Sequence, residues 1–170
     1  MSFDIITIWL SQLNIPLLTA VSQIIDNDMI FIAIILFIVF IAEQGKKRNR
    51  LVLTLAILFL FGVTVKSLVH EMRPCLQIPS KIQCPGDYSF PSNHALVAFA
   101  LATALWKKEN GWIYALFALF VAFTRIYLGV HTSFDVLGAI FLGITGYAVI
   151  TLLWERMPTA LKGSFLTFLG

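Results

Sequence analysis

Long apolar runs separated by short polar breaks make up most of this chain. Four of these runs are nearly uninterrupted, at 29–43, 51–70, 112–128 and about 134–154. A helix of roughly 20 apolar residues crosses the ~30 Å hydrocarbon core of a bilayer, so these runs predict membrane-spanning helices. A further helix is expected from Pro91 to Trp106, because proline suits the first turn of a helix.

The N-terminal stretch, residues 3–25, is also apolar, but it is interrupted by Ser11, Gln12, Asn14 and Pro16. Such a segment fits a span that crosses the bilayer or one that lies partly in the membrane interface. If it is counted as a span, the chain is an all-α, polytopic transmembrane bundle of six helices with a weak first span. Residues 74–90 carry three prolines, a Gly-Asp pair and both cysteines, which predicts an ordered loop.

Composition supports the membrane interpretation. Of 170 residues, 59% are hydrophobic and 12% are charged, and the mean hydropathy is +0.88. These are too few polar side chains to cover a soluble globule, so we expect one integral membrane domain over residues 1–170. The first basic residue is Lys46, so the N-terminus lacks the basic flank of a cleaved signal peptide. No nucleic-acid partner is implied.

The basic residues predict the orientation of the spans. With alternating spans, eight of the twelve Lys and Arg residues fall on one side: Lys46, Lys47, Arg48, Arg50, Lys107, Lys108, Arg156 and Lys162. That side is expected to be cytoplasmic. The opposite side holds Lys66, Arg73, Lys81 and Arg125, together with His70, His94 and His131. We therefore expect a cell-membrane protein with its polar clusters on the extracytoplasmic face.

Three cations gather at that face with no matching set of carboxylates in the sequence: Lys66, Arg73 and Arg125. A charge in mid-membrane costs about 2.5–3.5 kcal/mol on insertion scales, and like charges repel unless an anion joins them. Lys66 and Arg73 are seven residues apart, which predicts one helix face, with Pro74 ending the helix at or before Arg73. The pattern predicts a polyanion site, although Lys66 and Arg73 also fit ordinary snorkelling anchors.

Two further clusters carry candidate chemistry. The helix that starts at Pro91 leaves the amides around Ser92, Asn93 and His94 free to donate to an anion such as phosphate. His131 and Asp135 are four residues apart at the start of the last helix, which Thr132 or Ser133 can cap. The carboxylate can hold one imidazole nitrogen and leave the other as a nucleophile or base. No cluster has the ligand spacing for a divalent ion, so we expect no metal and no other cofactor.

Taken in order, these residues resemble the three-part signature of the type 2 phosphatidic acid phosphatases, a family that shares its site plan with the vanadium haloperoxidases. The matching residues are Lys66 with Arg73-Pro74, then Pro91-Ser92-Asn93-His94, then Arg125, His131 and Asp135. The resemblance covers residues 66–135. Asn93 stands where the family usually has glycine, and Thr124 where serine usually precedes the arginine. Membrane-embedded members typically have six spans.

The resemblance implies a metal-independent hydrolase of lipid phosphates. In such a site His131 attacks phosphorus to form a phosphohistidine, and Asp135 orients it. His94 protonates the leaving oxygen and later activates water. The phosphoryl oxygens are held by five residues and by backbone amides: Lys66, Arg73, Ser92, Asn93 and Arg125. His70 is left as structural or auxiliary.

The location of the site predicts the substrate class. Apolar helix faces below an outward-facing site suit an amphiphile, and the short 74–90 loop favours a small terminal phosphate. A polyprenyl diphosphate of the undecaprenyl type is expected first, with phosphatidic acid and phosphatidylglycerophosphate as alternatives. A non-enzymatic anion channel or transporter is a further alternative. The oligomeric state is not defined by the sequence. Cys75 and Cys84 fit either a disulfide or two free thiols.

Overall fold

The computed structural model describes residues 4–158, and these form only helices, turns and loops. The elements in chain order are α1 (Ile5–Gln12), α2 (Pro16–Asp26), α3 (Asp28–Ala42), α4 (Gly45–Val69), the 3-10 turn η1 (Pro74–Leu76), α5 (Asn93–Leu105), α6 (Gly111–Tyr127) and α7 (Ser133–Arg156). The expected all-α class is therefore confirmed for the described part of the chain.

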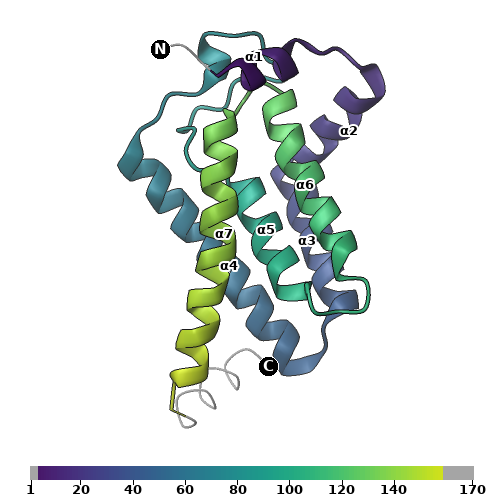
Figure 1. Cartoon of the computed structure of the whole chain (residues 1–170), viewed down its shortest axis with the longest axis vertical. Helices are drawn as coiled ribbons and strands as arrows, with labels where there is room; N and C mark the ends of the chain where they lie inside the picture. The colour runs from purple at the N-terminus through teal and green to yellow at the C-terminus, as the bar shows by residue number, and fades with distance from the viewer. Residues whose placement is uncertain (1–3, 159–170) are drawn as a thin grey trace.

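Helices α3, α5, α6 and α7 run roughly along the long axis of the molecule, α4 crosses it diagonally, and α5 lies among the others (Figure 1). Helix α5 packs against α3, α4, α6 and α7, and most of its residues are buried, among them Leu96, Leu101 and Leu105. Gly143 of α7 lies against this core helix, where an added Cβ would stand 2.5 Å from the carbonyl oxygen of Leu96. Glycine at this position therefore allows the two helices to approach closely.

The outer faces of the bundle are apolar. Helices α4 and α7 have 25 and 24 residues, and each contains an 18-residue stretch with a mean hydropathy of 2.3 or 2.2, respectively, so each is long and apolar enough to cross a membrane. Their outward side chains include Leu60 and Phe141, which are exposed in the isolated chain. Helices α3, α5 and α6 are apolar but shorter. A helical bundle with such an outer surface fits a hydrocarbon environment, where helices satisfy their own backbone groups.

The N-terminal segment is not one straight span. Helices α1 and α2 meet at 111°, with Pro16 as the first residue of α2. Both lie at the end of the bundle that also carries the loop between α4 and α5 (Figure 1). Polar contacts attach them there, since Thr7 Oγ1 accepts from the Ser133 amide at 2.9 Å and Tyr127 Oη lies 2.7 Å from Thr19 Oγ1.

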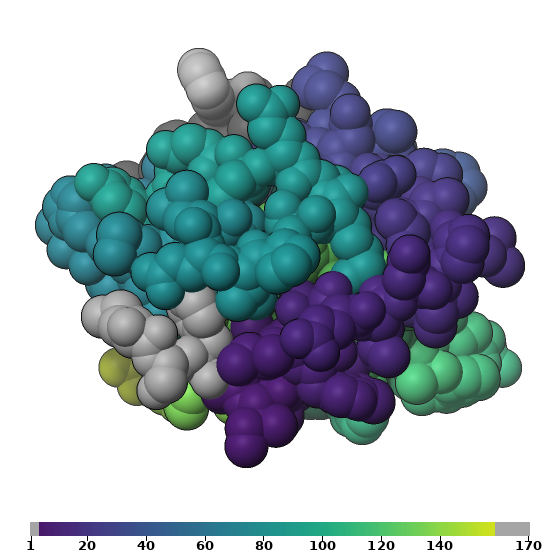
Figure 2. Space-filling model, turned by 90° about the horizontal axis from the view of Figure 1, so that it is seen from above, coloured from purple at the N-terminus to yellow at the C-terminus, as the bar shows by residue number. Residues whose placement is uncertain are grey.

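The α4–α5 loop is stapled and anchored. Cys75 and Cys84 form a disulfide, which settles the alternative that the sequence left open. Lys81 Nζ donates to the carbonyl oxygens of Ser11 at 2.5 Å and Tyr127 at 2.6 Å, so the loop is tied to α1 and to the end of α6. Seen from above, this loop and the N-terminal helices lie side by side over the end of the bundle (Figure 2).

Two sequence-based boundaries were wrong. Helix α5 begins at Asn93 with Ser92 as its N-cap, so Pro91 precedes the helix and is not in its first turn. Helix α4 begins at Gly45, so the basic run 46–50 lies in its first turns and not in a loop. Lys162 falls outside the described residues.

Candidate active site

A polar cavity of about 270 Å³ lies at the end of the bundle under the α4–α5 loop. Its walls come from the α2–α3 junction, α4, the loop, α5, α6 and the segment before α7: Asp26, Asp28, Phe59, Val63, Lys66, Arg73, Pro85, Asp87, Asn93, His94, Arg125 and His131. The structure therefore brings all three predicted clusters together. Ser92 and Asp135 do not line the cavity and are buried.

The pair of His131 and Asp135 is buried and well fixed. His131 Nδ1 lies 3.4 Å from Asp135 Oδ2, and the side chains are 2% and 0% exposed. The same carboxylate oxygen accepts from Ser89 Oγ at 2.5 Å and from the Thr132 amide at 2.7 Å. Asp135 also belongs to the capping box that starts α7, with Thr132 as N-cap. The start of one helix thus orients the histidine.

The imidazole of His131 is neutral before it reacts. Burial lowers its pKa below the ordinary histidine value, and this outweighs the opposing effect of the Asp135 carboxylate. Its Nε2 atom lies 3.1 Å from Arg73 Nη1, so a cation stands beside the nitrogen that faces away from Asp135. Arginine only donates, so the Nε2 lone pair accepts this hydrogen bond, and the bond must be given up before Nε2 can act as a nucleophile.

Lys66 and Arg73 converge, but not from one helix face as the spacing predicted. Helix α4 ends at Val69, and His70 adopts a left-handed conformation with φ 55°, its amide bonding the Lys66 carbonyl at 3.2 Å. The chain therefore turns before Arg73. Both cations meet at Asp87, with Lys66 Nζ 3.4 Å from Oδ2 and Arg73 Nη2 2.6 Å from Oδ1.

Three carboxylates at the cavity were missed by sequence reasoning. Asp87 joins Lys66 and Arg73 as described, Arg125 Nη1 lies 2.6 Å from Asp26 Oδ1, and His94 Nε2 lies 3.6 Å from Asp28 Oδ1. The expectation of unmatched cations was therefore wrong. Asp26 and Asp28 flank the break between α2 and α3, and Asp87 lies in an irregular loop. Neither segment has a repeating sequence pattern from which its contact with a cation far away in the chain could be predicted.

Asp87 is partly exposed and ionised. Burial opposes its ionisation, but Arg73 and Lys66 outweigh burial and hold the pKa of this carboxyl below its usual value. Its side chain is 54% exposed, so water screens both ion pairs. An incoming anion can compete with such a carboxylate for the two cations.

Buried polar atoms without hydrogen-bond partners concentrate at this site. Within residues 4–158 there are seven such side-chain atoms, and six belong to predicted site residues: Ser92 Oγ, Asn93 Oδ1, His94 Nε2, Arg125 Nε and Nη1, and Asp135 Oδ1. Arg125 Nη1 is within ion-pair distance of Asp26 but lacks hydrogen-bond geometry. Buried polar groups are normally satisfied, and the atoms of Asn93 and Arg125 line the cavity, where a polar ligand could satisfy them.

The start of α5 adds main-chain donors. No side chain caps this helix, so its first amides, from Asn93 onward, have no acceptor within the helix. The Ser92 amide is directed to the Asp135 carbonyl at 3.5 Å, which links α5 to α7. The free amides lie next to His94 at the positive end of the helix dipole, a place suited to a phosphoryl oxygen.

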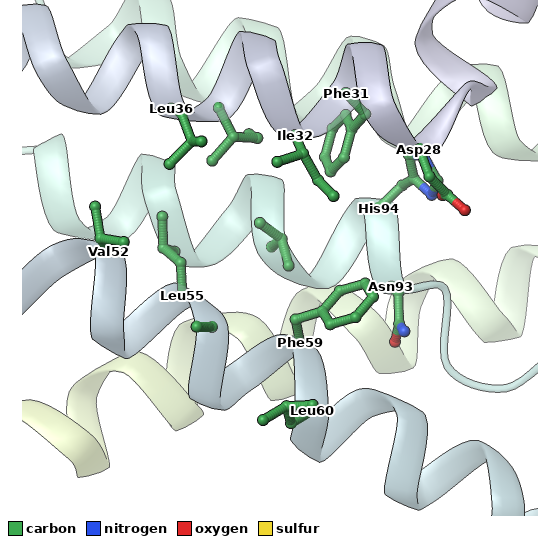
Figure 3. Close-up of a pocket in the computed structure, with 13 residues that line it drawn as sticks. Asp28, Phe31, Ile32, Leu36, Val52, Leu55, Phe59, Leu60, Asn93 and His94 are labelled. Carbon is green, nitrogen blue, oxygen red and sulfur yellow. The ribbon is translucent and has the colours of Figure 1, made fainter.

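An apolar groove of about 340 Å³ adjoins the polar cavity. It lies between α3, α4 and α5, and its walls include Ile32, Leu36, Val52 and Leu55 (Figure 3). The two spaces meet at four residues that line both: Asp28, Phe59, Asn93 and His94. A ligand with a phosphate in one space can therefore place an apolar chain in the other.

Across the described residues, no three His, Cys, Asp or Glu side chains are placed to hold one ion.

The model of the PAP2 superfamily matches residues 47–158 of this chain, which is more than half of it. The chain belongs to the PAP2 superfamily. Among the curated relatives, "Undecaprenyl-diphosphatase BcrC" of Bacillus subtilis (strain 168) is 29% identical over 157 residues, covering 83% of this chain and 79% of the relative. The family resemblance seen in residues 66–135 is thus confirmed.

Two solved structures share the fold. One is the "first transmembrane PAP2 type phosphatidylglycerolphosphate phosphatase from Bacillus subtilis", with a TM-score of 0.71, 22% identity, and coverage of 91% of this chain and 85% of that one. The other is Aquifex aeolicus LpxE, with a TM-score of 0.68, 23% identity, and coverage of 84% and 90%. At these identities the likeness establishes the membrane PAP2 fold.

Proposed function

We propose that this PAP2 protein removes the terminal phosphate of a polyprenyl diphosphate through a phosphohistidine on His131. The observation that carries the proposal is the junction at His94, where a cavity lined by three cations opens into an apolar groove. A molecule with both a phosphate and a long hydrocarbon chain matches this junction. A soluble phosphate ester would leave the groove unused.

In the first step, His131 Nε2 attacks the terminal phosphorus. Asp135 and Ser89 lie beside the other ring nitrogen, Nδ1, and keep the proton of the neutral imidazole there. The bond from phosphorus to the bridging oxygen breaks, and its electron pair stays on that oxygen. His94, at the mouth of the apolar groove, donates the proton that the leaving lipid requires.

In the second step, water attacks the phosphohistidine. His94, now neutral, takes a proton from this water, the phosphorus–nitrogen bond breaks, and phosphate is released. Lys66, Arg73 and Arg125 act in both steps because charge develops on the same phosphoryl oxygens each time. When the substrate binds, its phosphate takes the place of the carboxylates of Asp87 and Asp26 as the partner of these cations.

Support for the lipid class comes from the relatives. BcrC and a Sulfolobus acidocaldarius protein, the latter 28% identical over 123 residues, are both named undecaprenyl-diphosphatases. The Bacillus subtilis protein of known structure is a phosphatidylglycerolphosphate phosphatase, so glycerolipid phosphates stay as the alternative substrates. The three cations of the cavity, Lys66, Arg73 and Arg125, gather at one end of the bundle and are not spread through its depth, which favours a phosphatase over an anion pathway.

We further propose that the site faces the extracytoplasmic side of the cell membrane. The start of α4, which holds Lys47, and the α5–α6 turn, which holds Lys108, lie at the opposite end of the bundle from the α4–α5 loop (Figure 1). This distribution accords with the positive-inside rule. Helices α3 to α7 would then cross, while α1 and α2 stay at the outer face, giving five crossings in place of six.

Cysteines introduced at Lys47 and at Ser80 distinguish the orientations. Labelling of Ser80→Cys from the cytoplasm would reverse the assignment.

A substrate panel tests the function. Purified protein in one detergent is given a polyprenyl diphosphate, phosphatidate and phosphatidylglycerophosphate, each with a chelator present, and phosphate release is measured. We expect turnover without added metal and the highest kcat/KM for the polyprenyl diphosphate. A tenfold preference for a glycerolipid, about 1.4 kcal/mol in the transition state, would overturn the substrate assignment. A strict need for a divalent ion would overturn the mechanism.

A further inference from the structure

His94 is contacted by a helix that lies outside the superfamily match. Helix α3 ends at Ala42, before the matched region begins at residue 47. Phe31 of α3 packs on the imidazole, with 4.3 Å between ring centroids, and Asp28 stands one turn earlier on the same helix. Both side chains lie beside His94 at the end of the apolar groove (Figure 3). One helix thus supplies both a wall and a carboxylate to this histidine.

The charges around His94 single out Asp28. The groups that share its cavity are Lys66, Arg73, Arg125 and His131, with the carboxylates Asp26, Asp28 and Asp87. Asp87 is engaged by Lys66 and Arg73, and Asp26 is engaged by Arg125. Asp28 pairs with His94, and it has no second ion-pair partner among the described residues. The nearby cations oppose a positive charge on His94, and Asp28 favours it.

We propose that Asp28 is the positioning residue for the general acid of this PAP2 site. Its carboxylate lies 3.6 Å from Nε2 of His94, an ion-pair distance that is too long for a hydrogen bond. At this distance it stabilises the imidazolium and favours a proton on Nε2, which leaves Nδ1 for the leaving oxygen. The inference rests on the proposed function. The site then contains a second histidine–carboxylate pair, which serves the leaving group as His131 and Asp135 serve the nucleophile.

The proton balance closes with Asp28 ionised throughout. When the bond from phosphorus to the leaving oxygen breaks, the electron pair goes to oxygen, and oxygen takes the proton from His94 Nδ1. When water attacks the phosphohistidine, it returns one proton to the same nitrogen. Asp28 gains and loses no proton, and its effect is on the orientation and charge of the imidazole. Removal of the Asp28 carboxylate should therefore slow the reaction most for substrates whose leaving oxygen is strongly basic and needs a proton.

The test compares leaving groups in three variants. Asp28→Asn removes the charge and keeps the shape, Asp28→Glu restores the charge, and Glu43→Gln is the matched control. Glu43 caps the other end of α3 and pairs with Lys108 at 2.9 Å, so its loss also breaks an ion pair between α3 and the neighbouring turn. The substrates are p-nitrophenyl phosphate, whose leaving group is weakly basic, and phenyl phosphate, whose leaving group is more basic.

General acid catalysis contributes typically 10²–10⁴-fold, so for Asp28→Asn we expect a loss of kcat of about tenfold on phenyl phosphate and under about threefold on p-nitrophenyl phosphate. Asp28→Glu should recover part of the loss, and Glu43→Gln should leave the ratio of the two rates unchanged. Equal losses on both substrates, or none on either, would overturn the role of Asp28. If the unaltered protein released no phosphate from the lipid panel either, the proposed function itself would fail.

Discussion

The two histidines at the cavity stand in contrasting settings. His131 is paired within the start of one helix, and its partner Asp135 is fully buried and accepts from Ser89 and Thr132. His94 is paired across two helices, and its partner Asp28 has a side chain that is 80% exposed. The contrast suits two different tasks. A nucleophile needs one fixed tautomer, whereas an acid that becomes a base must gain and lose a proton in every cycle.

Burial also decides how much each pair contributes. A buried charge pair interacts in a low effective dielectric, and removing one partner leaves the other uncompensated. An exposed carboxylate is screened by water, so its loss costs far less. The effects of substitution should therefore fall steeply from the inner pair to the outer carboxylates.

The largest expected effect is the loss of the nucleophile. His131→Ala removes the atom that is placed to form the phosphoenzyme, so we expect kcat to fall by at least about 10³-fold while the protein still folds. The matched control is His70→Asn, because His70 lies at the same end of the bundle and asparagine tolerates its left-handed backbone. Phosphate release and the thermal unfolding of each variant in detergent are compared. Near-normal turnover in His131→Ala would refute the assignment.

The next effect concerns Asp135. Asp135→Asn keeps the size of the side chain but loses control of the His131 tautomer, so kcat should fall on the order of 10²- to 10⁴-fold. The loss should be the same for good and poor leaving groups, because the carboxylate acts on the attacking nitrogen. This differs from the selective loss expected for Asp28→Asn. A strong dependence on the leaving group in Asp135→Asn would erase the distinction between the two pairs.

Local spacing explains which parts of the site were predictable. His131 and Asp135 are four residues apart at the start of a helix, so helical geometry alone places them together. The same reasoning failed for Lys66 and Arg73, because His70 turns the chain out of the helix between them. Their convergence depends instead on Asp87, and that contact is set by the fold of the disulfide-closed loop.

The fold, like the site, could be predicted from the sequence only in part. Apolar runs of helical length located α3, α4, α6 and α7, since hydrocarbon-facing helices must be continuously apolar. The 3–25 segment was harder, because interruptions at Asn14 and Pro16 allow either a span or a bent pair, and the structure has the bent pair. Asp26 and Asp28 flank a second break, between α2 and α3, and the sequence pattern gives no sign that this break lies at the cavity.

The smallest expected effect concerns Asp87, the half-exposed carboxylate on Lys66 and Arg73. Its pKa is below the ordinary value in the folded protein, so the stability from these ion pairs is present above the unfolded pKa of about 3.9 and is lost as pH falls through the folded pKa. Because the side chain is 54% exposed, the contribution at pH 7 should not exceed about 1 kcal/mol. Asp87→Asn should therefore lower the midpoint of thermal unfolding slightly at pH 7. As the pH is lowered below about 4, the difference between the two proteins should shrink. Glu109→Gln, at an exposed carboxylate on the opposite end, is the control. A difference between Asp87→Asn and the unaltered protein that persisted undiminished at low pH would show that Asp87 stabilises the loop by packing and not by charge.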